Sequence, residues 1–148
     1  MRLSSNQGLI TSFKIILLHG VYSCVESIFR AICITIYEKK DLKSFYSLYD
    51  KLLKKSELDK DGRRDILSLA NHTRNTFHNN GIYLPNIDIK PPDKYRGVDM
   101  KFIKGEPLKF ASVYFILDIV SDLVNICIEI LNSNKIDLNE VKLPEKGK

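Results

Sequence analysis

Apolar residues recur every three to four positions from about residue 5 to residue 37, and this pattern constrains the fold more than any other feature. The stripe consists of Ile10, Phe13, Leu17, Val21, Val25, Ile28, Ile32 and Ile36. This spacing predicts one long helix. A second apolar set covers part of its other face: Ile16, Leu18, Tyr22, Phe29 and Ile34. A helix that is apolar nearly all round is buried on two sides, either by its own chain or by a second subunit.

Three shorter apolar patterns predict three more helices, near residues 42–55, 63–79 and 111–132. Asp41 is the expected N-cap of the second helix. The 148 residues suffice for one domain with a real core. We therefore predict an all-α fold, an up-and-down four-helix bundle spanning residues 1–136, followed by a polar C-terminal tail at 137–148.

Residues 81–110 differ in kind from the helical segments. They hold four of the five prolines and short alternating segments at 98–103 and 108–110, around Lys104-Gly105. Alternation on both sides of a glycine turn predicts a β-hairpin. We expect a hairpin or loop insert here, before the last helix, with its turn at Lys104-Gly105.

Charge and cysteine usage bound the chemistry. A formal net charge of +5 is compatible with a nucleic-acid partner, although pairs such as Lys54-Lys55 are expected on solvated helix faces. The three cysteines lie in apolar stretches without metal-ligand spacing, which predicts buried free thiols in a reducing compartment. We expect no metal site and no cofactor.

The first residues do not have the pattern of a secretory signal. Residues 1–7 are polar, and the apolar stretch that follows carries Lys14 and His19. No window holds 18 uncharged apolar residues. We expect a soluble, cytoplasmic protein that does not associate with membranes.

The segment at residues 74–81, at the end of the third predicted helix, carries the candidate chemistry. Arg74 and His78 are four residues apart and share one helix face, about 5–6 Å apart at Cβ. An arginine can hold phosphate and a histidine can move protons near neutral pH, which together suffice to cut RNA without a metal. The alternative is structural: Gly81 can end the helix in a left-handed conformation, and Arg74 can bind the exposed helix carbonyls.

Four helices with Arg74, Asn75 and His78 ending the third resemble the HEPN superfamily of small all-α bundles. That family places a polar residue beside an arginine, and four to six residues separate this arginine from a histidine. Here three residues separate Arg74 from His78, one fewer. The segment at Glu26 to Arg30 is similar to that of members that set an acidic or polar residue against the motif.

The resemblance implies a homodimer that joins two copies of the motif in a cleft and cuts RNA without metal. Its members act as toxins, in anti-phage defence or in RNA processing, and others only bind. On this view Arg74 clamps the phosphate, His78 transfers a proton, and Asn75 contacts phosphate or fixes the imidazole tautomer. One chain supplies one such histidine, so a second would come from the partner. The supporting residues are Glu26, Arg30 and Asn79.

Several of these residues also have ordinary roles. Glu26 can orient the motif or pair with Arg30. His19 is expected in the core or in a subunit interface. Asn79 and Asn80 are expected to cap the helix. Two tyrosines near the motif, Tyr83 and Tyr95, can stack on bases or cover the core.

The leading hypothesis is thus a metal-independent HEPN-type endoribonuclease, a toxin or anti-phage defence effector with RNA as substrate and an antitoxin or other protein as partner. The first alternative is a non-catalytic, dimeric HEPN-like module that binds RNA or protein, favoured by the shorter motif. The second is a structural dimer without a nucleic-acid role, in which the motif caps a helix. In each case we expect the homodimer to form through the first helix and the last one.

Overall fold

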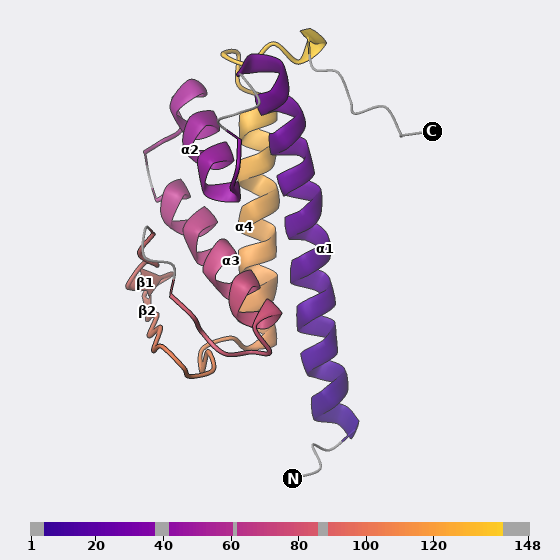
Figure 1. The fold of residues 1–148 in the computed structure, drawn as a ribbon, viewed down its shortest axis with the longest axis vertical. Coiled ribbons are helices and arrows are strands. Elements are labelled where there is room, and N and C mark those ends of the chain that lie inside the picture. Colours follow the sequence, from indigo (N-terminus) through magenta and orange to yellow (C-terminus); the bar gives the residue numbers. More distant parts are fainter. Residues whose placement is uncertain (1–4, 38–41, 61, 86–88, 141–148) are drawn as a thin grey trace.

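A computed structural model describes residues 5–37, 42–60, 62–85 and 89–140 of the chain. Four helices, α1 (Ser5–Ile36), α2 (Phe45–Lys55), α3 (Arg63–His78) and α4 (Val113–Leu131), form a bundle, and a small hairpin precedes α4. In Figure 1, α1 and α4 run side by side, and the N-terminal turns of α1 reach beyond the end of α4. The predicted all-α four-helix bundle with a hairpin insert is confirmed.

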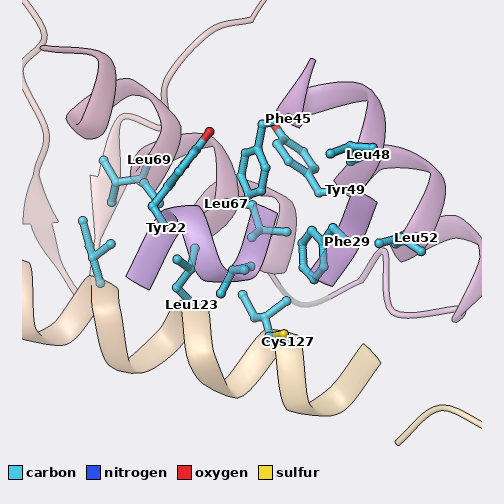
Figure 2. Packing of buried hydrophobic residues seen from close by; sticks show 14 of the residues in the cluster. Tyr22, Phe29, Phe45, Leu48, Tyr49, Leu52, Leu67, Leu69, Leu123 and Cys127 are labelled. Atoms are coloured by element: carbon cyan, nitrogen blue, oxygen red, sulfur yellow. The ribbon is translucent and has the colours of Figure 1, made fainter. Parts of the chain in front are cut away.

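The core of the bundle is an aromatic and leucine-rich cluster to which all four helices contribute. Tyr22 and Phe29 from α1 stack against Phe45 of α2, with ring centroids 4.5 Å and 5.9 Å away. Leu67 of α3 and Leu123 of α4 close the cluster, and all five side chains are buried (Figure 2). Neighbouring side chains pack against these buried rings on every side. Because α1 could not shift without opening gaps around them, this cluster fixes the position of α1 against α2 and α3.

Helix α2 begins three residues later than the sequence predicted. Its N-cap is Ser44, which accepts a hydrogen bond from the Ser47 backbone, and the Ser47 side chain bonds back to the Ser44 backbone. This reciprocal capping satisfies two backbone N–H groups and sets the helix start at Phe45. The predicted cap, Asp41, lies outside the described residues, and residue 42 precedes the helix.

The position predicted for the hairpin turn is wrong. Strands β1 (Lys94–Tyr95) and β2 (Val98–Asp99) pair antiparallel around Arg96 and Gly97, whose φ angles are 49° and 77°. Two positive φ angles suit the twist of a two-residue hairpin. The Arg96 guanidinium also bridges Asp118 and Asp122 of α4, at 2.8 Å each.

The Lys104-Gly105 turn exists but joins different partners. Residues beside it pair with the segment that leaves α3: Tyr83 donates its backbone N–H to Glu106, and Ile82 forms a bridge with Pro107. The local pattern identified a turn correctly but assigned its strands to each other. The reason is that the chain after α3 lies beside the Lys104-Gly105 turn, and Tyr83 there forms backbone hydrogen bonds with Gly105 and Glu106.

Helix α1 leaves an apolar face uncovered. A groove of about 560 Å³ runs between α1 and α4, lined by eleven residues that are nearly all apolar. Ile16 is 71% exposed on its rim, and Leu9 beyond it is 72% exposed. Cys24 lines the same groove and is exposed, so the prediction that all three thiols are buried is wrong for this one. By length and composition alone, α1 is also apolar enough to cross a membrane.

Candidate functional site

Arg74 stands on α3 with its guanidinium over the ring of Tyr22 from α1. The centre of the guanidinium lies 5.2 Å from the ring centroid, within the range of a cation–π interaction. Nη1 donates to the Asn75 side chain at 3.0 Å, and the buried Nε has no hydrogen-bond partner. No carboxylate of a described residue forms an ion pair with Arg74, and the ring of Tyr22 holds its guanidinium in place.

A short polar network fixes the floor beside this arginine. The Tyr22 hydroxyl donates to Asn71 Oδ1 at 2.8 Å, and Asn75 Nδ2 reaches the same oxygen at 3.4 Å. Asn71 and Tyr22 are both buried. Burial raises the pKa of the Tyr22 hydroxyl, with the carboxylate of Glu26 adding to the rise, so the hydroxyl stays a donor.

His78, the last residue of α3, meets a histidine of α1. The rings of His19 and His78 lie edge to face with their centroids 4.6 Å apart. His78 is exposed and His19 is half-buried. The pKa of His19 is lowered, first by burial and then by the neighbouring His78 and Arg74. The structure thus brings Arg74, Asn75 and His78 together at one end of α3, with His19 beside them.

The end of α3 is closed by its own backbone and not by the arginine. The backbone N–H groups of Asn79 and Gly81 both bond to the carbonyl of Thr76, at 3.1 Å and 2.9 Å. Asn80 takes the left-handed conformation, with a φ of 55°, and Gly81 follows at 81°. The left-handed residue at the cap is therefore Asn80 as well as Gly81. Among the described residues, Arg74 donates to no helix carbonyl, so these backbone bonds end the helix without it.

Glu26 and Arg30, predicted as supporting residues, pair with each other. Arg30 Nη2 lies 2.8 Å from Glu26 Oε1, and Arg30 Nη1 donates to the Leu42 carbonyl at 2.9 Å. The pair ties α1 to the segment that leads into α2. Glu26 therefore has its hydrogen-bonded cation within its own helix, and no hydrogen bond joins it to a described residue of the motif.

A polar cavity of about 270 Å³ opens beside Arg74. Its walls come from α1, from the start of α2 and from α3. The lining residues are Tyr22, Glu26, Lys43, Ser44, Phe45, Tyr46, Asn71, Arg74, Asn75 and Ile89. The lining carries two cations, Lys43 and Arg74, against one carboxylate, Glu26. With two amides and aromatic walls beside them, this set suits an anionic ligand that carries a flat ring. His78 and Asn79 are not on its lining; they lie at the end of the same helix.

The sequence interpretation missed His19 as a member of this cluster. His19, Tyr22, Glu26 and Arg30 follow one another at spacings of three and four along an apolar helix. Such spacing places polar side chains on one helix face. This polar stripe on an otherwise apolar helix is the sequence signal that could have identified His19 as part of the cluster.

Other aromatic and imidazole groups near the motif are structural. Tyr83 and Tyr95 are buried, which favours the core-covering role over base stacking. Tyr95 donates its hydroxyl to Asp122 at 2.6 Å. His72 is buried against Tyr83 and Phe102 and takes no part in the contact between His19 and His78.

Among the described residues, no group of three or more histidine, cysteine, aspartate or glutamate side chains is placed to hold a metal ion. The three cysteines are free. The chemistry available at the end of α3 is thus that of a fixed guanidinium, two amides and two imidazoles. These groups can bind a phosphate and exchange protons with its neighbours.

Comparison of the chain with protein-family models, with curated proteins and with solved structures finds no match.

Proposed function

We propose that the protein is a metal-independent endoribonuclease of the HEPN type. The observation that carries this proposal is the cluster at the end of α3, where two imidazoles lie close to Arg74 and no described carboxylate forms an ion pair with the arginine. The structural alternative has Arg74 binding the helix carbonyls, and no carbonyl of a described residue accepts a hydrogen bond from it. An arginine that pairs with no carboxylate of the described residues, and that is held over an aromatic ring, is suited to an anion from outside the chain.

In the proposed reaction, the 2′-hydroxyl of RNA attacks the adjacent phosphorus, and the arginine offsets the charge on the phosphoryl oxygens. A histidine removes or supplies the proton, a role that typically contributes about 10²–10⁴-fold in rate. Asn75, already bonded to Arg74, holds the guanidinium plane toward the cavity. DNA lacks the 2′-hydroxyl and would bind without being cut.

We further propose that the apolar face of α1 and α4 is covered by a second copy of the chain. A membrane is the other candidate, because α1 has the length and composition to cross one. However, Lys14, Glu26 and Arg30 lie on the same helix, and a charged side chain within a bilayer costs several kcal/mol. His19 and Gly20 are consecutive, and Gly20 lines the groove, so a partner on this face would lie close to the site.

The test is cleavage of single-stranded RNA by the wild type and by His78→Ala, both with EDTA present. We expect the wild type to release products that end in a 2′,3′-cyclic phosphate and His78→Ala to release none. His78 is exposed, so its loss leaves the fold intact. Asn132→Ala, an exposed change at the end of α4, is the control and should cut normally. Equal cleavage by wild type and His78→Ala would exclude the proposed site.

A second candidate function is a non-catalytic module that binds RNA or a protein. The short spacing between Arg74 and His78 favours it. If neither protein cuts RNA while the wild type still binds it through Arg74, this second function is the correct one. A toxin or anti-phage role, with a neutralising protein partner, is the biological setting that we propose for the nuclease.

A further inference from the structure

We infer that His19 is the second proton-transfer group of the site, so that each subunit carries a complete acid–base pair with His78. This inference rests on the proposed RNA cleavage. It changes the role of the partner subunit, which would then shape the cleft without supplying the missing histidine. The chain has three histidines, and two of them meet at the end of α3 while the third is buried elsewhere.

The geometry supports two imidazoles acting on one phosphate. The ring centroids of His19 and His78 are 4.6 Å apart, and the rings are nearly perpendicular, at 85°. Perpendicular rings direct their nitrogens along different lines, so the two groups can address two different oxygens of the same phosphodiester. His19 lies near enough to Arg74 for the charge of the guanidinium to act on it.

The surroundings of the two rings differ, and the difference assigns their roles. His19 is half-buried, and burial together with His78 and Arg74 lowers its pKa, so His19 is neutral at neutral pH and is the base. His78 is exposed and takes the role of acid. The groups that act on His19 both come from α3; among the described residues, no charged side chain of α2 or α4 is one of them.

The proton balance of the reaction is closed within the two imidazoles. His19 takes the proton of the 2′-hydroxyl while the 2′-oxygen forms a bond to phosphorus. The bond from phosphorus to the 5′-oxygen breaks, and the protonated His78 gives its proton to that oxygen. The products are a 2′,3′-cyclic phosphate and a 5′-hydroxyl. No water or redox partner is consumed, and both histidines regain their starting states by proton exchange with solvent.

A substrate with sulfur in place of the bridging 5′-oxygen distinguishes acid from base, because a thiolate leaves without being protonated. Wild type, His19→Asn and His78→Asn are compared on ordinary RNA and on this phosphorothiolate RNA. On ordinary RNA, we expect each variant to lose about 100-fold or more in rate. On the phosphorothiolate, His78→Asn should recover most of the wild-type rate, and His19→Asn should not. Ser23→Asn, an exposed change one turn further along α1, is the control and should behave as wild type.

A second measurement separates a chemical role for His19 from a structural one. Free imidazole is added to His19→Ala, and we expect it to restore cleavage of ordinary RNA in proportion to the concentration of neutral imidazole. The lower limb of the wild-type pH–rate profile should also disappear in His19→Asn. If His19 only packs, free imidazole should not restore cleavage by His19→Ala, and His19→Asn should keep the lower limb of the pH–rate profile.

These experiments can overturn the role of His19 without overturning the proposed RNA cleavage. If the wild type cuts RNA and His19→Asn keeps its rate and pH profile, the inference is overturned and the proposed function stands. If the phosphorothiolate rescues His19→Asn, or fails to rescue His78→Asn, the assignment of base and acid is overturned. A wild type that cuts no RNA overturns the proposed function and, with it, the acid–base role of His19.

Discussion

The rings of His19 on α1 and His78 on α3 lie edge to face with their centroids 4.6 Å apart, although the whole of α2 separates the two helices in sequence. The contact depends on how deeply α1 is seated against α3, which the buried Tyr22 and Phe29 determine one to three turns further along. The site is therefore a property of the packed bundle. It does not exist in an isolated α3 peptide, even though that peptide contains the whole Arg74–His78 segment.

Removing the guanidinium should weaken RNA binding. For Arg74→Ala we expect a loss of about 10–100-fold in affinity for a 2′-O-methyl RNA that cannot be cut, since a charge-assisted hydrogen bond contributes about 1.5–3 kcal/mol. Arg74→Lys should fall between, because lysine keeps the charge and loses the planar fork. Fluorescence anisotropy at several salt concentrations measures both. Arg96→Ala, which removes an exposed cation already paired with two aspartates, is the control; an equal loss there would indicate general charge attraction only.

A charge placed on the apolar face should separate the subunits. Ile16 is 71% exposed on the rim of the groove, so Ile16→Glu can be accepted by the single chain but not by a dimer that buries this face. We expect light scattering to give a dimer for wild type and a monomer of 17.0 kDa for Ile16→Glu. Ile103→Glu, an exposed isoleucine in the insert, should remain dimeric. A monomeric wild type at micromolar concentration would contradict the proposed interface.

Stability should fall in mild acid through His72. Burial lowers the pKa of His72 below its usual 6.5, against a smaller opposing contribution from the Ile89 backbone. Between the lowered value and 6.5 the unfolded chain binds more protons than the folded one, so the free energy of unfolding rises with pH and is lost as pH falls through this window. Urea unfolding at several pH values should show this slope, and His72→Phe should reduce it. An unchanged slope in His72→Phe would assign the effect to His19, whose pKa is lowered too.

The hydroxyl of Tyr22 should matter for stability and for the position of Arg74. Tyr22→Phe keeps the ring beneath the guanidinium and removes the donor to Asn71, which we expect to cost about 1 kcal/mol in the free energy of unfolding. Tyr46→Phe is the matched control, since the Tyr46 hydroxyl has no hydrogen bond to a described residue. Chemical denaturation measures both. A Tyr22→Phe protein as stable as wild type would mean that water replaces the lost donor.

The helices could be predicted from the sequence because their signal is local. The apolar residues that give α3 and α4 their 3.6-residue period, and the residues that cap α3, lie within a few positions of one another in the sequence. The observed ends of these two helices differ from the predicted ends by two residues at most. The start of α2 was missed because serine and aspartate cap helices about equally well. The choice between Ser44 and Asp41 was therefore not decided by residue type.

The position of the hairpin turn and half of the imidazole pair could not be predicted in this way. The turn at Arg96 and Gly97 is anchored by aspartates on α4, and the segment near Gly105 is held by residues that follow α3. Likewise, His19 acquires its meaning only when α1 packs with one particular face toward α3. Each of these features depends on contacts between segments distant in sequence, which local periodicity does not encode.

The position of His78 at the final residue of α3 ties the site to the segment of the helix that opens most easily. Terminal turns fray at far lower free energy than a whole bundle unfolds, and backbone hydrogen bonds from Asn79 and Gly81 close the last turn of α3. Opening that turn disperses the imidazole pair while the core around Phe29 stays packed. Heat should therefore switch the site off before it melts the protein, and amide hydrogen exchange near Asn79 should report the state of the site while the core remains protected.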